Sequence, residues 1–324
     1  MTRLVDSATC EALLRPREVV TALAAAHVSH HRGAITQPVP TALDLPGHDH
    51  LDAARRPRHV LMSAADRDVT LVKTLLDAPA RRDDGGPAQR SVIAVHSTRT
   101  GECLALVDGR AVTRVRTAAA TVLAVSTLAR PDLRLLGVLG AGALALEHLR
   151  AARDHLGVVE VLLWSRAPSS VGALAASAGE LGLRARLADS PAAVAAAADA
   201  VVTVTPATEP LLRAADLRPG LHVSAVGSPP RPGYREVDAA SFAAADLVVV
   251  DDRAIAVAES AQVRHAVAAG FDPGRLVEIG AVLAGDHPGR TDPDQVTLHS
   301  SIGVALQDLA AIRVLLERLG TSVP

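Results

Sequence analysis

The stretch Leu-Arg-Leu-Leu-Gly-Val-Leu-Gly-Ala-Gly-Ala-Leu-Ala, residues 133–145, decides the fold of this chain. A short apolar run, typical of a buried parallel strand, leads into Gly140-x-Gly142-x-x-Ala145 and then into a helical pattern over residues 146–155. Gly140 permits a tight turn, Gly142 lets backbone N–H groups approach a pyrophosphate, and Ala145 keeps the helix close to the strand. This pattern predicts a dinucleotide site with the phosphates at the helix N-terminus.

The composition disfavours several classes of function. A formal net charge of -2 gives no reason to expect a nucleic acid or an anionic membrane as partner, and only 2 Phe, 1 Trp and 1 Tyr are present for stacking on bases. The 2 cysteines, Cys10 and Cys103, imply no disulfide framework and fit a reducing compartment. No signal peptide is recognisable, and no apolar run approaches the ~20 residues that cross a bilayer. We therefore expect a soluble cytoplasmic protein.

The first part of the chain predicts an α+β unit. A helix is expected over residues 16–27, followed by a Pro/Gly/His-rich loop over residues 37–58. Two of the strand-like runs that follow are joined by Thr98-Arg-Thr-Gly101, which is typical of a hairpin. The predicted strands cover residues 59–62, 69–72, 91–95 and 103–107.

The second part alternates between strands and helices. An Ala-rich helix is expected from Thr117 to about Leu128, where Pro131 ends it before the glycine-rich turn. Further strands are predicted at residues 159–164, 200–204, 222–226 and 247–250. The alternation predicts an α/β fold: a doubly wound Rossmann-type parallel sheet in residues 117–297, and an α+β substrate-binding and dimerisation domain in residues 1–116 plus 298–324. The last helix is expected over Thr297–Leu319.

The residues after the second predicted strand bear on the choice of cofactor. An acidic residue normally stands there and binds the adenosine ribose, but this chain has Ser165-Arg166. A hydroxyl and a guanidinium can hold a 2′-phosphate that a carboxylate would repel. The pair therefore favours NADP(H) over NAD(H). The alternative is that Arg166 is only a solvated loop residue.

A further segment, residues 105–120, reads Ala-Leu-Val-Asp-Gly-x-x-Val-Thr-x-x-Arg-Thr-Ala-Ala-Ala. Together with the glycine-rich turn, Lys73, Ala225-Val-Gly227 and residues 296–308, it resembles the ornithine cyclodeaminase / mu-crystallin family over about residues 35–315. The resemblance implies a nicotinamide-dependent enzyme with an amino-acid-like substrate. It also implies a homodimer formed through the first domain.

The resemblance assigns roles to individual residues. Lys73 matches the family's active-site lysine, whose ammonium can protonate or polarise a C=N or C=O bond. Arg116 matches the arginine that binds the substrate carboxylate, and we expect it at the head of a helix. Read without the family, the two residues would be a surface lysine and a structural ion-pair partner. With the turn and strand-end residues above, the predicted cofactor contacts are Thr117, Gly140, Gly142, Ala143, Leu144, Ser165, Arg166, Thr205, Val226, Gly227, Ser228 and Ser301, the last near the substrate.

Two departures from the family pattern bear on the reaction. Cyclodeaminases carry a carboxylate after the Ala-Val-Gly strand end, where this chain has Gly227-Ser228-Pro229-Pro230-Arg231 and no Asp near Pro229. This run looks more like the ketimine reductase-like branch, which also has a Ser there. The family's usual second basic residue is replaced by Pro40. Cyclodeamination needs proton transfers around the substrate amine, whereas hydride transfer to a C=N bond needs one proton donor and a carboxylate anchor.

Other polar residues receive structural interpretations. The pairs His30-His31 and His48-x-His50 lack the separated partners of a closed zinc site, so we expect no metal. His59 is interpreted as a half-buried structural residue, with a role near Lys73 as the alternative. Asp308 is expected to form a salt bridge or to support the last helix near the cleft rather than to be catalytic. Glu236, Asp251 and Asp252 are expected at the surface or at strand ends.

These observations lead to one main hypothesis and two alternatives. The chain is expected to be an NADP(H)-dependent oxidoreductase acting on the Cα–N bond of an amino or imino acid, as a ketimine reductase or amino-acid dehydrogenase. One alternative is amine elimination of the ornithine cyclodeaminase or 2,3-diaminopropionate synthase type. The other is a crystallin-like protein that binds NADPH and a ligand without turnover.

Overall fold

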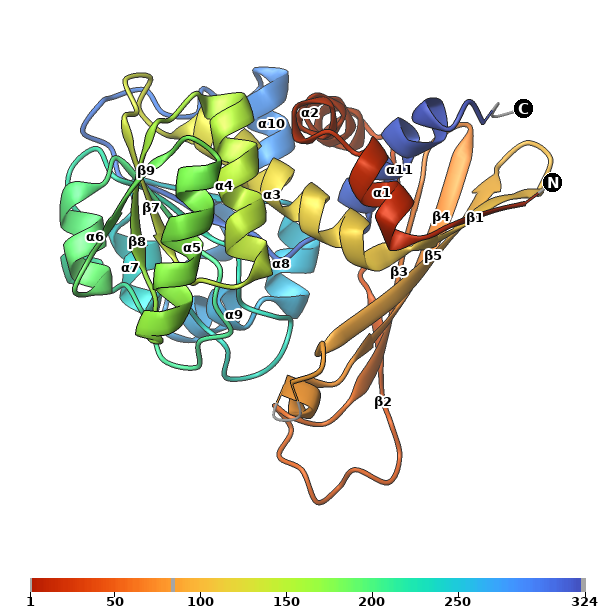
Figure 1. The fold of residues 1–324 in the computed structure, drawn as a ribbon, viewed down its shortest axis with the longest axis horizontal. Helices are drawn as coiled ribbons and strands as arrows, with labels where there is room; N and C mark the ends of the chain where they lie inside the picture. The colour runs from red at the N-terminus through yellow and green to blue at the C-terminus, as the bar shows by residue number, and fades with distance from the viewer. Residues whose placement is uncertain (1, 83–84, 322–324) are drawn as a thin grey trace. The chain divides into compact units, whose positions relative to one another are not determined.

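The structure is a computed structural model that describes residues 2–82 and 85–321 (Figure 1). The chain forms two compact units, one comprising Met1–Arg116 with Val304–Pro324 and the other Thr117–Gly303. Helix α3 (Gly109–Leu128) belongs in part to each. Within the described ranges, none of the helices has the length and apolar character needed to cross a membrane.

A six-stranded sheet forms the centre of the first unit, in the order β1-β6-β5-β4-β3-β2. All pairs are antiparallel except β1 with β6, and the predicted hairpin is confirmed as β5–β6. Each predicted strand is longer than its apolar run. The elements are β1 (Arg3–Val5), α1 (Ser7–Leu13), α2 (Pro16–His31), β2 (Thr41–Asp44), β3 (Arg58–Ala65), β4 (Val69–Asp77), β5 (Gln89–Ser97), β6 (Cys103–Asp108) and α11 (Ala305–Arg318).

The two faces of this sheet differ in how far they are buried. Alternating residues such as Leu71, Ile93 and Val95 are fully buried, and α11 contacts both β3 and α2. Side chains of the opposite parity remain exposed, although many are apolar. Strand alternation therefore gives the unit one packed face and one open face.

The second unit contains an eight-stranded sheet in the order β13-β12-β14-β11-β10-β7-β8-β9, and every pair in it is parallel. The predicted Rossmann-type α/β fold is confirmed. The strands are β7 (Leu135–Leu139), β8 (Glu160–Trp164), β9 (Arg184–Leu187), β10 (Ala200–Thr203), β11 (His222–Ala225), β12 (Leu247–Val250), β13 (Leu276–Glu278) and β14 (Thr297–Ser300). The helices are α4 (Ala143–Leu156), α5 (Pro168–Glu180), α6 (Pro191–Ala197), α7 (Ala239–Ala244), α8 (Arg253–Glu259), α9 (Ala261–Ala268) and α10 (Ile279–Ala284).

The strand order explains how the sheet divides. β7 carries the glycine-rich turn, β8 and β9 extend to one side of it, and β10 and β11 extend to the other. This reversal is the topological switch point where dinucleotides bind, beyond the carboxyl ends of the strands. Small and branched apolar side chains fill the core, and Phe242 and Phe271 meet edge to face at 5.7 Å between ring centroids.

The starts of two predicted helices are wrong, and the helix predicted over residues 16–27 extends to His31 as α2. Residues 297–300 form β14 between β11 and β12 rather than the first turn of the last helix, which begins at Ala305. Thr-Leu-His-Ser is buried on both faces, and Gly303 has a φ of 75°, so a turn separates strand from helix. The residues up to 303 therefore lie in the second unit, not the first as predicted from 298. Helix α3 begins at Gly109, eight residues before the expected Thr117.

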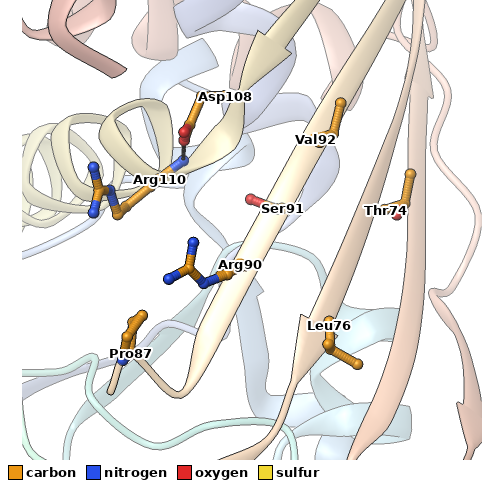
Figure 2. A pocket seen from close by; sticks show the side chains of 8 residues that line it. All are labelled: Thr74, Leu76, Pro87, Arg90, Ser91, Val92, Asp108 and Arg110. Atoms are coloured by element: carbon orange, nitrogen blue, oxygen red, sulfur yellow. Dashed lines mark hydrogen bonds between the residues drawn. The ribbon is translucent and has the colours of Figure 1, made fainter. Parts of the chain in front are cut away.

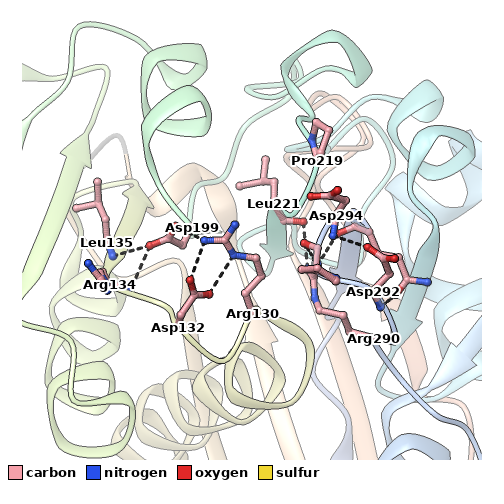
Figure 3. A network of polar contacts seen from close by, with 12 residues as sticks. Arg130, Asp132, Arg134, Leu135, Asp199, Pro219, Leu221, Arg290, Asp292 and Asp294 are labelled. Carbon is pink, nitrogen blue, oxygen red and sulfur yellow. Dashed lines mark hydrogen bonds and ion pairs between the residues drawn. The ribbon is translucent and has the colours of Figure 1, made fainter.

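Polar side chains form hydrogen bonds along the edge of the parallel sheet at which the strands begin, its amino edge (Figure 3). The carboxylate of Asp199 accepts hydrogen bonds from the backbone N–H groups of Arg134 (2.9 Å) and Leu135 (3.0 Å), where β7 begins. Arg290 donates to the carbonyl oxygen of Leu128 (2.7 Å) and to the Thr297 hydroxyl (3.0 Å). These contacts satisfy strand and helix ends away from the carboxyl edge, which stays available for a ligand.

Candidate functional site

The predicted phosphate site lies at the carboxyl end of β7. Gly140 has a φ of 123°, and a Cβ there would lie 2.9 Å from the carbonyl oxygen of Val204, so only glycine fits. Gly142 is the N-cap of α4, makes no side-chain cap, and would meet nothing within 4 Å if it carried a Cβ. The first turn of α4 has no acidic residue. Open space, an uncapped helix start and the absence of a carboxylate there fit a pyrophosphate.

A hollow of about 260 Å³ surrounds this turn. Ser165 and Arg166, directly after β8, lie on its wall, and the side chain of Arg166 is exposed. The single tryptophan of the chain, Trp164, also lines it. The full lining is Gly140, Ala141, Gly142, Trp164, Ser165, Arg166, Ala167, Val204, Thr205, Pro206, Ala207 and Leu211. The structure thus brings the predicted residues Gly140, Gly142, Ser165 and Arg166 to one hollow, and these residues fit a dinucleotide. The other predicted phosphate contacts do not line it: Ala143 and Leu144 begin α4, and Thr117 lies within α3.

The predicted residues on the nicotinamide and substrate side follow the ends of β10, β11 and β14: Thr205, Val226, Gly227, Ser228 and Ser301. A Cβ on Gly227 would lie 2.1 Å from the backbone nitrogen of Thr205, so these two strand ends touch. The Ser228 hydroxyl is buried without a hydrogen-bond partner among the described residues. Ser301 donates to Asp251 at 2.7 Å. An unpaired buried hydroxyl beside the strand ends is a candidate ligand contact.

A buried cluster of charges occupies the first unit. Lys73 on β4 is 1 % exposed, and its Nζ donates to both carboxylate oxygens of Asp308 at 3.0 and 3.2 Å and to the Thr113 hydroxyl at 2.8 Å. Arg116 donates from Nη1 to Gln307 at 2.9 Å, and its Nε lies 3.4 Å from an oxygen of Asp308. Asp308 is fully buried. One carboxylate therefore faces both predicted substrate-binding cations.

The charges in this cluster do not cancel. With Lys73 protonated, two cations and one carboxylate leave a net charge of +1 in a buried place, so a substrate carboxylate would complete the balance. Burial lowers the pKa of Lys73 from its ordinary value of 10.5, Asp308 opposes this shift, and Arg116 adds to it. A lysine with a lowered pKa gives up its proton more readily, as a proton donor to a substrate nitrogen must.

The structure corrects several interpretations of single residues. Arg116 lies in the middle of α3, so the helix N-terminus does not assist it, and Thr117 likewise follows within that helix. Glu236, Asp251 and Asp252 are all buried rather than at the surface, although Asp251 does follow a strand end.

His59 is half-buried, as expected, and contacts the Thr74 hydroxyl at 3.1 Å. The register of β3 with β4 places it on the sheet face opposite to Lys73. No group of side chains suited to hold a metal occurs in the described part of the chain.

Sequence reasoning underestimated Asp308, Gln307 and Glu236. A signal was present for the first two, because a Gln-Asp pair stands within an otherwise apolar helical pattern near the end of the chain. A carboxylate on the buried side of a helix requires a cation or several hydrogen bonds. Nothing in the sequence indicates which cation that is.

Comparisons with known proteins identify the family of this chain. The sequence model described as "Ornithine cyclodeaminase/mu-crystallin family" matches residues 4–322. The chain is 34% identical over 232 residues to the iminosuccinate reductase of Paracoccus denitrificans, covering 70% of each protein. It is 30% identical over 283 residues to the ketimine reductase mu-crystallin of Rattus norvegicus, covering 87% of this chain and 85% of the relative.

Solved structures of relatives share the whole fold. The iminosuccinate reductase of Paracoccus denitrificans in complex with NAD+ superposes with a TM-score of 0.88 at 28% identity, covering 98% of this chain and 96% of that one. An archaeal alanine dehydrogenase dimer with bound NAD superposes with a TM-score of 0.89 at 25% identity, covering 98% and 95%. Both relatives bind a nicotinamide cofactor.

Proposed function

We propose, because this chain belongs to the ornithine cyclodeaminase/mu-crystallin family, that it is an NADP(H)-dependent oxidoreductase acting on the Cα–N bond of an amino or imino acid. The reaction is of the ketimine reductase or amino-acid dehydrogenase type. The observation that carries the proposal is the buried cluster in which Lys73 and Arg116 share Asp308.

The residues of this cluster divide the work in the following way. Arg116 binds the substrate carboxylate through its planar guanidinium, and Gln307 fixes one edge of that group. Lys73 delivers a proton to the substrate nitrogen as the carbon receives a hydride, so that C=N becomes CH–NH. A bound nicotinamide supplies the hydride in this direction and accepts it in the reverse. Asp308 holds the Lys73 ammonium in place.

The departure from the cyclodeaminase pattern supports plain hydride transfer. This chain has no Asp near Pro229, where the cyclodeaminases carry a carboxylate, and the hydroxyl of the preceding Ser228 cannot act as a base at the substrate amine as a carboxylate can. The relatives reported above include a reductase of iminosuccinate and a ketimine reductase.

The preference for NADP(H) rests on Ser165 and Arg166. Both line the hollow directly after β8, where the ribose of the adenosine is bound in this fold. The exposed guanidinium of Arg166 can turn toward a 2′-phosphate, and no acidic side chain lines the hollow to repel it.

The test is a screen for NADPH oxidation with imino acids, and with keto acids in the presence of amines, followed by the absorbance of the reduced nicotinamide. We expect turnover by the wild-type protein and a loss of at least about 100-fold in Lys73→Ala, since a lost general acid typically costs this much or more. Full turnover by Lys73→Ala and Arg116→Ala would refute the assigned roles. Release of ammonia without net NADPH consumption would indicate cyclodeamination. Tight NADPH binding without turnover would indicate a ligand-binding protein.

The open face of the first unit's sheet supports a homodimer. The register places six exposed apolar side chains on this face, one or two from each of five strands: Leu4, Leu43, Val72, Leu76, Val92 and Leu106. A hollow of about 310 Å³ is lined by two of them, Leu76 and Val92, together with Arg90 and Asp108 (Figure 2). Contiguous apolar patches on soluble proteins mark interaction surfaces. A second copy of this chain is the proposed occupant, and the archaeal alanine dehydrogenase is a dimer.

A further inference from the structure

The two halves of the parallel sheet have different tasks in a dinucleotide-binding fold. β8 and β9 lie on the adenosine side of β7, whereas β10 and β11 lie on the other side, where the second nucleotide half binds. Thr205 and Gly227, which follow β10 and β11, belong to this second half. The position of their backbone therefore determines where a nicotinamide ring can lie.

One carboxylate joins these two strand ends. Glu236 accepts hydrogen bonds through Oε1 from the backbone N–H of Thr205 (2.6 Å) and from its hydroxyl (2.8 Å). Its Oε2 accepts from the backbone N–H of Gly227 at 2.6 Å. The same N–H also points at the carbonyl oxygen of Thr203, at the longer distance of 3.1 Å. The two carboxylate oxygens thus hold one strand end each.

The backbone of Gly227 packs directly against the backbone of Thr205. A Cβ on Gly227 would lie 2.1 Å from the nitrogen and 2.5 Å from the oxygen of Thr205. Such contact between two main-chain segments is stable only if their N–H groups find acceptors, because unpaired buried N–H groups are costly. Glu236 supplies the acceptor for the N–H of Thr205 and the nearer of the two acceptors for the N–H of Gly227.

Glu236 is itself fixed from the other side. Its carbonyl oxygen accepts from the backbone N–H groups of Leu211 (2.8 Å) and Leu212 (3.1 Å), and its own N–H donates to Gln262 at 3.4 Å. Gln262 in turn donates to the hydroxyl of Ser300, at the end of β14, at 2.8 Å. Hydrogen bonds through Gln262 therefore connect the backbone of Glu236 to a third strand end, that of β14.

The chemistry of Glu236 differs from that of an ordinary ion pair. The side chain is 0% exposed, and its close donors are main-chain N–H groups and a hydroxyl rather than a cation. Burial raises the pKa of Glu236, and the hydrogen bonds from Thr205 and Gly227 oppose that shift. Short charge-assisted bonds to N–H groups are the strong kind, and they fix the geometry of the groups that donate them.

We propose that Glu236 is a positioning residue that sets the nicotinamide half of the cofactor site by holding the ends of β10 and β11 together. The inference rests on the proposed function. Glu236 acts through Thr205 and Gly227 and not by contact with the reacting atoms. Loss of the Glu236 carboxylate is expected to weaken binding of the nicotinamide half of the cofactor and to leave binding of the adenosine half unchanged.

The experiment compares two ligands by calorimetry: the complete reduced dinucleotide that the wild-type protein prefers, and the matching nicotinamide-free adenosine diphosphate ribose. Glu236→Gln keeps the size of the side chain but turns an NH2 group toward N–H donors. We expect the affinity for the complete dinucleotide to fall at least about tenfold and that for the nicotinamide-free ligand by less than about threefold, since a lost charged acceptor leaves a buried donor unsatisfied. Glu236→Asp, which keeps the charge but shortens the reach, is expected to show the same selective loss.

The matched control is Asp199→Asn. Asp199 also accepts from two backbone N–H groups of the same sheet, but at its amino edge (Figure 3). We expect this variant to bind both ligands with unchanged relative affinity. If Glu236→Gln lowered the affinity for both ligands equally, or for neither, the inference about Glu236 would be overturned while the proposed function would stand. Failure of the wild-type protein to bind any nicotinamide dinucleotide would overturn the proposed function and the inference with it.

Discussion

Replacement of Asp308 by Asn tests the charge balance of the buried cluster. In the wild-type protein Lys73, Arg116 and Asp308 together carry a net charge of +1, as counted above. Asp308→Asn leaves two buried cations and a net charge of +2. Removing one partner of a buried pair costs about 3–5 kcal/mol, and here the lost carboxylate served two cations, so we expect the upper part of that range.

Lys73→Met gives the contrasting case. The methionine is apolar and similar in length, and Asp308 keeps its contact with Arg116 at 3.4 Å. The net charge of the cluster falls to zero, so the free energy of unfolding should fall less than in Asp308→Asn. In the double variant the two effects should not add, because the charges interact directly, and a coupling of about 0.5–3 kcal/mol is expected.

The assay is urea unfolding followed by circular dichroism for the wild-type protein, both single variants and the double variant. A loss below about 1 kcal/mol in Asp308→Asn would refute the reasoning, because it lies well under the cost of an uncompensated buried charge. A larger loss in Lys73→Met than in Asp308→Asn would refute it as well.

The same variant has a defined pH dependence. The pKa of Lys73 lies below the ordinary 10.5, so the unfolded chain binds more protons than the folded protein at pH values between the two. The free energy of unfolding of the wild-type protein therefore rises with pH across that window. The full cost of burying the protonated Lys73 is present at pH values below it. Asp308 raises the pKa of Lys73, so Asp308→Asn lowers it further. The deficit of this variant should shrink as the pH rises, and a deficit that grows with pH would contradict the assigned electrostatics.

Three further results are expected. The rate of imino-acid reduction should fall as the pH rises through the lowered pKa of Lys73, and a pH–rate profile that stays flat at alkaline pH would exclude Lys73 as proton donor. Arg166→Asp should reduce the ratio of NADPH to NADH affinity by at least about tenfold, because a carboxylate repels the 2′-phosphate. The fluorescence of Trp164 measures both affinities. An unchanged ratio would mean that Arg166 is only a solvated loop residue. Leu76→Glu should convert the proposed dimer to a monomer in light scattering, whereas an unaltered mass would place the interface elsewhere.

The family and the parallel-sheet fold could be predicted from the sequence because their signals are local. A glycine-rich turn needs particular residues at fixed spacing, and Gly140, which was expected to permit a tight turn, has a positive φ there. The hairpin of β5 and β6 likewise follows from two alternating runs and one glycine. Lys73 and Arg116 could be named only through the resemblance to a family, since a single lysine on a strand carries no local signal.

Tertiary structure decided the partners of the charged residues. Asp308 lies 235 positions from Lys73 in the chain, and only the packing of α11 against the first unit's sheet brings the two together. The same holds for Glu236, whose burial depends on two strand ends that meet at Gly227. Residues 297–300 became a strand because β11 and β12 stand apart by one strand's width and offer hydrogen bonds on both sides.

The glycine-rich turn and the alternation of strands and helices were thus determined by the sequence itself, because turn geometry and hydrophobic period act over a few neighbouring residues. The tertiary structure alone decided which buried charge meets which, because burial makes the cost of an unpaired charge depend on residues from distant parts of the chain. In this protein the tertiary structure brings Asp308 to Lys73 and Arg116, and Glu236 to Thr205 and Gly227.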